Sequence, residues 1–374
     1  LGRIRDKIKL RKEKTGKKSI VAVAGCVGQA QGKEIMKRSP WVDIVVGPQS
    51  YQNLPELISK VDPIKNNKHI DIQFPTIPKF DDLDVDINNR SPSAFLTIQE
   101  GCDKFCTFCV VPYTRGAEYS RSFISIVDEA KKLVDAGAKE ITLLGQNVNA
   151  WNAIGKDKKI WGLGRLIEEL SKIKELRFIR YTTSHPLDMD IELIKAHRDF
   201  DKLMPYLHLP VQSGSDKVLQ MMNRKHTAKE YIKVIEKVRD YNPQIAISGD
   251  FIIGFPGETD KDHKATLDLI REINYSQAYS FKYSSRPGTP AVVFFDHVDE
   301  NIKSARLQEV QDLLRLQQMR FNKKSINSTL NVLVLKKGKK NDQYLGRTPF
   351  NQSIYFSSKN KNLIGSTIDI TVKD

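Results

Sequence analysis

The chain has 374 residues, 40% of them apolar, which is enough for two or three domains with hydrophobic cores. Sixty Lys and Arg against 45 Asp and Glu give a net charge of +15, which favours a polyanionic partner, with nucleic acid as the leading candidate. No run approaches the roughly 20 apolar residues that span a bilayer, and the basic, polar first residues do not resemble a signal peptide. We therefore expect a cytoplasmic protein without membrane contacts.

The chain starts with Leu1 rather than Met, and we expect that a further segment precedes it. Residues 1–18 are rich in Lys and Arg, which suits either a solvated helix face or contact with RNA. Two short β-rich apolar runs, 19–24 and 42–47, flank a helix-compatible stretch. We predict that residues 1–65 form part of a small α/β domain.

A linker is predicted over residues 66–93, because the stretch from Asp71 to Ser93 is rich in Asp, Pro and Asn. Six strand-like runs, separated by helical patterns, then fill residues 94–327. The runs are 94–98, 141–145, 177–183, 203–209, 245–254 and 276–283. Such alternation implies a parallel sheet, which can form an open barrel or a doubly wound sheet. In either case the chemistry is expected at the carboxyl ends of the strands.

The last stretch, residues 328–374, loses the helical period and contains three short strand-like runs between polar turns. We predict a small all-β domain there. It carries basic side chains that suit either an RNA-binding surface or the tip of a solvated hairpin. These are Lys336, Lys337, Lys339, Lys340 and Arg347.

The most specific motif is CxxxCxxC, formed by Cys102, Cys106 and Cys109 in the loop after the first barrel strand. A structural zinc site needs four ligands, and no fourth Cys or His lies nearby. Three thiolates can instead hold a 4Fe-4S cluster and leave one iron open for a substrate. Inert core cysteines or a zinc knuckle are the alternatives.

With the aromatic Phe108 before its last cysteine, this motif resembles that of the radical S-adenosylmethionine (SAM) superfamily. Further segments resemble the methylthiotransferase family within it, and the likeness covers essentially the whole chain. These segments are GCDKFCTFCVVPYTRG (101–116), LLGQNVNAW (143–151), TTSHP (182–186), HLPVQSGS (208–215), GDFIIGFPGET (249–259) and SSRPGTPA (284–291). The resemblance implies an α/β fold with a methylthiotransferase N-terminal domain, a partial (β/α)6 barrel as the radical-SAM core and a C-terminal TRAM domain.

The resemblance also implies the chemistry of the site. The cluster on the three cysteines would bind the amino and carboxylate groups of SAM through its open iron, and one-electron reduction would yield a 5′-deoxyadenosyl radical. Motif by motif, it places Phe108 near the SAM adenine. It makes Gln146, Ser184, Gln212 and Asp250 polar SAM contacts. For Ser184 and Gln212, ordinary hydrogen bonding at a strand end is the alternative.

The fourth cysteine, Cys26, follows a predicted strand in the sequence AGCVGQ. A single cysteine in this position is usually a small buried apolar residue. In the family, GCxxQ contains the third of three ligands to a second, auxiliary 4Fe-4S cluster. The other two ligands would lie upstream of Leu1, so the ligand set is incomplete in this sequence.

The strongest resemblance is to the MiaB-like branch of the family, which acts on N6-isopentenyladenosine beside the tRNA anticodon. NVNAW (147–151) and VVPYTRG (110–116) favour this branch. It implies transfer of sulfur and a methyl group to C2 of the base, the tRNA anticodon stem-loop as partner, a reductant such as flavodoxin or ferredoxin, and a monomer. The alternatives are a methylthiotransferase for threonylcarbamoyladenosine or for a ribosomal protein, and a non-catalytic iron-sulfur RNA-binding protein.

Overall fold

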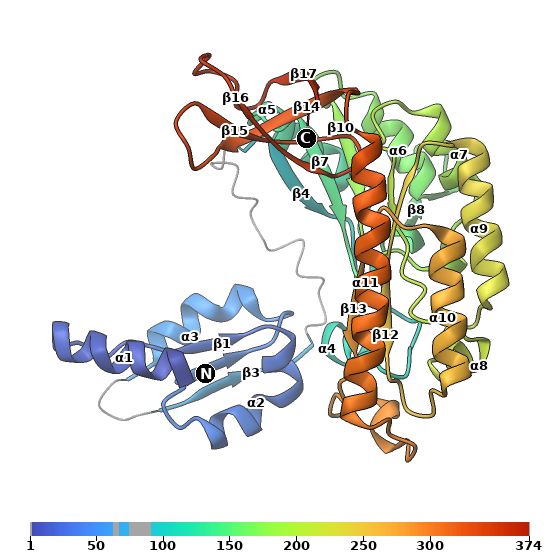
Figure 1. Cartoon of the computed structure of the whole chain (residues 1–374). Coiled ribbons are helices and arrows are strands. Elements are labelled where there is room, and N and C mark those ends of the chain that lie inside the picture. The colour runs from blue at the N-terminus through green and yellow to red at the C-terminus, as the bar shows by residue number, and fades with distance from the viewer. Residues whose placement is uncertain (1, 63–66, 75–90, 374) are drawn as a thin grey trace.

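The computed structural model describes residues 2–62, 67–74 and 91–373 (Figure 1). Its N-terminal part is a three-stranded parallel sheet, in the order β1-β2-β3, that packs against α2. The elements are α1 (Gly2–Thr15), β1 (Ala22–Ala24), α2 (Cys26–Arg38), β2 (Ile44–Val46), η1 (Tyr51–Asn53), α3 (Leu54–Lys60) and β3 (His69–Asp71).

Strand β3 corrects our prediction of a linker over residues 66–93. Residues 69–71 lie within that stretch, yet Ile70 pairs in parallel with Val45 of the buried strand β2. A three-residue strand has too few side chains to show an alternating pattern against Asp-rich and Pro-rich surroundings. The part of the predicted linker at 75–90 lies outside the described residues.

Six parallel strands form the central part of the fold. They are β4 (Ser93–Thr97), β7 (Glu140–Leu144), β10 (Phe178–Tyr181), β11 (Tyr206–His208), β12 (Ala246–Ile253) and β13 (Gln277–Lys282). Two three-stranded sheets, β4-β7-β10 and β11-β12-β13, are joined by a parallel bridge between Ile179 and Leu203. The spatial order therefore follows the chain order without the reversal of a doubly wound sheet. All six predicted strands are confirmed, and so is the α/β class with a partial (β/α)6 barrel.

Helices cover the outside of these strands (Figure 1). They are α5 (Phe123–Asp135), α6 (Leu163–Ser171), α7 (Ile191–Asp199), α8 (Asp216–Met221), α9 (Ala228–Tyr241), α10 (Asp260–Ile273) and α11 (Glu300–Lys324). Shorter elements are β5 (Gln99–Glu100), α4 (Val111–Arg115), β6 (Tyr119–Ser120), η3 (Val148–Ala150), β8 (Asn152–Ile154), β9 (Ile160–Gly162), η4 (Pro186–Asp188) and η5 (Pro290–Val293). Tyr231, Ile235 and Val238 of α9 are fully buried at helical spacing, so apolar periodicity fixes which face meets the strands. Among the described residues, no helix is long and apolar enough to cross a membrane.

The C-terminal part is a four-stranded antiparallel sheet in the order β16-β15-β14-β17. Its strands are β14 (Thr329–Lys337), β15 (Gln343–Arg347), β16 (Ser353–Ser357) and β17 (Thr367–Thr371). Arg347 of this sheet and Arg180 of β10 both reach Glu140, the first residue of β7. The sheet is therefore attached where the barrel strands begin, and the loops that follow those strands lie at the other end (Figure 1).

Candidate functional site

The three cysteines of the motif lie in one loop beyond the carboxyl end of β4. This cysteine loop, residues 101–110, leaves strand β5 and returns through α4 to β6, which pairs antiparallel with β5. The short ladder closes the loop at its base. Carboxyl ends of parallel barrel strands are where active sites are built, so the loop lies where the chemistry was predicted.

Gln99 and Gly101 fix the start of the cysteine loop. Gln99 is fully buried, and its Oε1 accepts hydrogen bonds from the backbone N–H groups of Gln146 at 2.8 Å and Asn147 at 2.9 Å. Its Nε2 donates to the carbonyl of Gly101 at 2.7 Å. Gly101 has a φ of 74°, and a Cβ on it would lie 2.0 Å from the carbonyl oxygen of Ala117. Only glycine therefore fits where the loop begins.

The segment after α8 holds the other side of the cysteine loop. Thr107 donates through Oγ1 to the carbonyl of Met221 at 2.8 Å and through its N–H to the carbonyl of Met222 at 3.1 Å. Asn223 Nδ2 donates to the carbonyl of Phe105 at 2.9 Å. The backbone of the cysteine loop is thus held on one side by Gln99 and on the other by the end of α8 and Asn223. These contacts restrict where the three sulfurs can lie.

The three thiols are shielded from solvent to different degrees. Cys106 is buried, and Cys102 and Cys109 are half-buried. Burial raises the pKa of the Cys102 thiol to about 11; a backbone hydrogen bond from Lys104 opposes this, while Cys106 and Cys109 raise it further. Burial also raises the pKa of Cys109, and Cys106 adds to the effect. The sulfurs are therefore close enough to repel one another as thiolates, and a cationic centre that displaces their protons would relieve that repulsion.

Arg224 contacts the cysteine loop, which the sequence did not indicate. It is buried, its Nη1 lies 3.7 Å from Cys106 Sγ, and its Nη2 donates to the carbonyl of Pro210. Its charge also acts to lower the pKa of Cys109. Arg224 is 118 positions from Cys106 in sequence, so only the fold brings the guanidinium to the sulfur.

The residues predicted to contact SAM have different partners in the structure. Phe108 packs against the apolar cluster that contains Phe255 of the GFPGE turn. Gln146 uses its Oε1 to accept the N–H of Gly101 at 2.8 Å, so this atom supports the cysteine loop. Gln212 and Asp250 are neighbours, because the Gln212 N–H donates to the Asp250 carbonyl at 3.0 Å.

Ser184 Oγ, Asn147 Oδ1 and His185 Nε2 are among the eleven buried side-chain atoms that have no hydrogen-bond partner in the described part of the chain, and Arg224 Nε is another. Asn147 follows β7, and His185 follows β10. Asn147 Nδ2 and Lys104 Nζ both donate hydrogen bonds to the carboxylate of Asp188, which lies three residues after His185. Unsatisfied buried polar atoms are costly, so a water molecule or a polar ligand is expected to pair with them. Ser184 was predicted as a SAM contact; Asn147 and His185 lie inside the quoted family segments but were not predicted as contacts, and His185 was interpreted as local structure.

Cys26 lies near the cysteine loop although it belongs to the N-terminal sheet. It is the first residue of α2, and its charge is among those that raise the pKa of Arg115 in α4 and the pKa of Cys109. Burial would lower the pKa of Arg115, but Cys26 and Glu100 outweigh it and raise that pKa. A second contact between these parts is the hydrogen bond from Gln49 Nε2 to the Arg115 carbonyl at 2.7 Å.

The donor set of the cysteine loop consists of three thiols. No group of three or more His, Cys, Asp or Glu among the described residues is arranged to hold a metal ion. Three thiols on one loop, an arginine at one sulfur and unsatisfied polar atoms beside them match a cluster with a polar ligand at its open iron.

Known proteins resemble this chain over its whole length. A profile described as the Radical SAM superfamily matches residues 96–270. The tRNA-2-methylthio-N(6)-dimethylallyladenosine synthase of Rickettsia felis is 53% identical over 373 residues, which cover 100% of this chain and 83% of the relative. The synthase of the same name from Agrobacterium fabrum is 51% identical over 376 residues, covering 100% of this chain and 82% of the relative.

Among solved structures, coproporphyrinogen III oxidase from Escherichia coli, titled a radical SAM enzyme, matches with a TM-score of 0.46 and 14% identity. That match covers 70% of this chain and 69% of the oxidase. The family rests on the relatives above, whose identity is far over 30% along the full chain. This chain belongs to the tRNA-2-methylthio-N(6)-dimethylallyladenosine synthase family of radical SAM proteins.

Proposed function

We propose that this protein is a tRNA methylthiotransferase, which adds sulfur and a methyl group at C2 of N6-isopentenyladenosine beside the anticodon. One observation carries the proposal: the whole chain aligns with synthases named for this modification, and it retains the three-cysteine loop at the carboxyl end of the barrel. The net charge of +15 suits an RNA substrate. We infer from the same relatives that the protein works in the cytoplasm.

Family membership implies a 4Fe-4S cluster and SAM. Cys102, Cys106 and Cys109 would hold the cluster, which when bound supplies the electron that splits SAM into methionine and a 5′-deoxyadenosyl radical. Arg224 donates a hydrogen bond to Cys106 Sγ and so stabilises the charge on the sulfur. Its partner Pro210 keeps the guanidinium in place.

The protein's own residues would orient SAM beside the cysteine loop. Ser184, Asn147 and His185 offer buried hydrogen-bonding atoms at the ends of β7 and β10. Phe108 and Phe255 provide an apolar surface for the adenine. Because burial and the nearby Arg224 lower the pKa of His185 to about 2, its ring stays neutral at physiological pH and can position a ligand without adding charge.

We propose three functional parts for the chain. The N-terminal sheet corresponds to the methylthiotransferase domain, with Cys26 as one ligand of an auxiliary cluster beside Arg115 and Cys109. The six-stranded barrel is the radical-SAM core. The C-terminal sheet is a TRAM-like RNA-binding domain, whose lysines at the β14–β15 turn are exposed. We infer that the protein acts as a monomer and receives its electrons from a flavodoxin or ferredoxin.

The decisive test asks whether the cluster is catalytic or structural. Full-length protein is reconstituted anaerobically with iron and sulfide, reduced, and incubated with SAM, and 5′-deoxyadenosine is measured by chromatography. A catalytic cluster yields 5′-deoxyadenosine in proportion to cluster content. Protein that holds a reducible cluster and leaves SAM intact would support the iron-sulfur RNA-binding alternative instead.

A further inference from the structure

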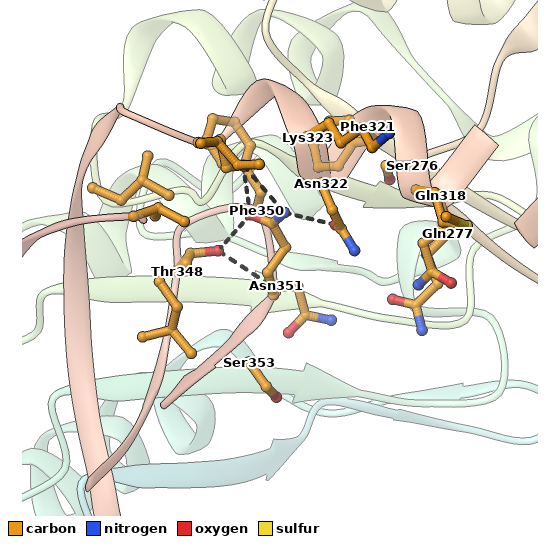
Figure 2. Close-up of a pocket in the computed structure, with 17 residues that line it drawn as sticks. Ser276, Gln277, Gln318, Phe321, Asn322, Lys323, Thr348, Phe350, Asn351 and Ser353 are labelled. Atoms are coloured by element: carbon orange, nitrogen blue, oxygen red, sulfur yellow. Dashed lines mark hydrogen bonds between the residues drawn. The ribbon is translucent and has the colours of Figure 1, made fainter. Parts of the chain in front are cut away.

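A second hollow lies far from the cysteine loop, where the end of α11 meets the C-terminal sheet and the start of β13. Figure 2 shows this pocket, which has a volume of about 570 Å³, within the range of small-ligand sites. The first turns of α11 contact the other end of the barrel through the ion pair of Arg306 with Glu258. Asn322 follows Arg306 by 16 positions, which corresponds to about 24 Å along the helix. The pocket is therefore separate from the site around the cysteines.

Side-chain amides dominate the polar lining of the pocket. The carboxamides of Gln277, Gln318, Asn322 and Asn351 gather around one open space (Figure 2). Gln352 holds one wall in place, because its Nε2 donates to Asn322 Oδ1 at 2.8 Å. A carboxamide presents both a donor and an acceptor, which is the pattern needed at the edge of a nucleobase.

Aromatic and basic side chains complete the lining. Phe350 meets Phe321 edge to face, with ring centroids 6.0 Å apart. Lys323 is the charged residue among the described residues that line the pocket, and none of these lining residues is a carboxylate. A lining of this kind accepts an anionic ligand with an aromatic face.

We propose that this pocket binds an unpaired nucleotide of the tRNA substrate, other than the adenosine that is modified. The base stacks on Phe350 and is read by the carboxamides of Gln318 and Gln277, while Lys323 approaches the phosphate. The proposal rests on the proposed function, because it takes its RNA from there. It gives the C-terminal sheet and α11 a shared role in aligning the RNA with the distant cysteine loop.

The test uses full-length protein and isopentenylated tRNA purified from cells that lack the gene. Dissociation constants are measured over a range of salt for the wild type, Phe350→Leu, Gln318→Ala and Lys323→Gln. Phe350→Leu and Gln318→Ala should each weaken binding about 5-fold or more at every salt concentration without changing the slope, since stacking and base contacts release no counterions. Lys323→Gln should instead lower the slope of log K against log salt by about 0.7 to 0.9.

Gln308→Ala is the matched control, because Gln308 is an exposed carboxamide on α11 outside the pocket. It should bind like the wild type. Melting temperatures and SAM cleavage without RNA establish that each variant is folded. Affinity equal to the wild type for both Phe350→Leu and Gln318→Ala would overturn the inference, whereas a wild type that binds no tRNA would instead refute the proposed function.

A cross-linking measurement identifies the nucleotide independently. Met319 lies at the rim and is 52% exposed, so it can be replaced by p-benzoylphenylalanine with little disturbance. Irradiation of its complex with the tRNA should join residue 319 to an unpaired nucleotide away from the modified position. Cross-links confined to paired stem nucleotides, or to the target adenosine, would contradict the assignment.

Discussion

Arg224 Nη1 lies 3.7 Å from Cys106 Sγ, and both side chains are buried where the cysteine loop meets the end of α8. A cation and N–H donor at a ligand sulfur favours the reduced, more negative cluster. Arg224→Gln should therefore shift the midpoint potential of the reconstituted cluster to a more negative value, and Arg224→Lys should shift it less. Redox titration followed by electron paramagnetic resonance measures the shift.

The neighbouring exposed Lys225 provides the control for Arg224. Lys225→Gln removes the same charge from a side chain outside the buried site and should leave the potential unchanged. Equal potentials in Arg224→Gln and Lys225→Gln would show that the contact with Cys106 does not tune the cluster.

Substitution of any of the three loop cysteines should abolish most SAM cleavage, whereas substitution of Cys26 should not. Cys102→Ala, Cys106→Ala or Cys109→Ala should each lower 5′-deoxyadenosine formation by more than about 100-fold. Loss of a residue that only supports a metal ligand costs up to about 100-fold in activity, and loss of a ligand itself should cost more. Cys26→Ala should retain cleavage, because Cys26 lies outside the cysteine loop, at the start of α2. A loop variant that keeps both its iron content and its cleavage activity would rule out the assigned ligand set.

The buried charges at Glu140 attach the C-terminal sheet to the barrel. Arg180 Nε donates to Glu140 Oε2 at 2.7 Å, Arg347 also binds this carboxylate, and the carboxylate is fully buried. Glu140→Gln leaves two guanidinium groups near an uncharged partner and should lower the free energy of unfolding by about 3 to 5 kcal/mol. Denaturant titration measures the loss. Glu175→Gln, which breaks only the exposed pair with Lys139, should cost at most about 1 kcal/mol.

The same carboxylate predicts how stability depends on pH. Burial alone would raise the pKa of Glu140, but Arg180 and Arg347 outweigh it and hold that pKa below the ordinary 4.5. Because the folded-state pKa is the lower one, the stabilisation is fully present above pH 4.5 and is lost as the pH falls through the folded-state value. The wild type should therefore lose its advantage over Glu140→Gln in acid. A stability difference that stays constant down to about pH 2 would contradict this linkage.

The lysines at the β14–β15 turn should contribute to RNA affinity through charge alone. Replacing the four exposed lysines 336, 337, 339 and 340 by Gln should reduce the salt slope of tRNA binding by about 0.7 to 0.9 for each phosphate that is no longer neutralised. The control replaces three lysines, the exposed Lys229, Lys233 and Lys237 of α9 on the outer face of the barrel, so the change in slope is compared per replaced lysine. If both sets change the slope equally, the turn is not a specific part of the RNA surface.

The sequence predicts the barrel well because most of its strands carry buried apolar and β-branched residues, as in β7, where Ile141 and Leu143 are fully buried. It predicts the edges of the smaller sheets poorly. Strand β3 is short and partly polar, and β15, which contains Gly346 and Arg347, was absent from the predicted strands. Both gain their place from pairing with a neighbouring strand, which local composition does not encode.

The candidate site also has one part that the sequence predicts and another part that only the fold reveals. The cysteine motif is local, so spacing alone identifies it. Arg224 and Arg347 act on residues 118 and 207 positions away, and only the fold reveals these contacts. Gln146 shows a further limit, because a polar residue in a family motif can face the ligand or support its own loop, and its Oε1 supports the loop at Gly101.

The most direct test of the proposed function is nucleoside analysis of tRNA from cells with and without the intact gene. Total tRNA is digested and its nucleosides are separated by liquid chromatography and identified by mass spectrometry. Cells with the gene should contain 2-methylthio-N6-isopentenyladenosine. Cells without it should accumulate N6-isopentenyladenosine, and returning the gene, but not its Cys106→Ala variant, should restore the methylthiolated form. Unchanged 2-methylthio-N6-isopentenyladenosine in cells that lack the gene would contradict the proposed function.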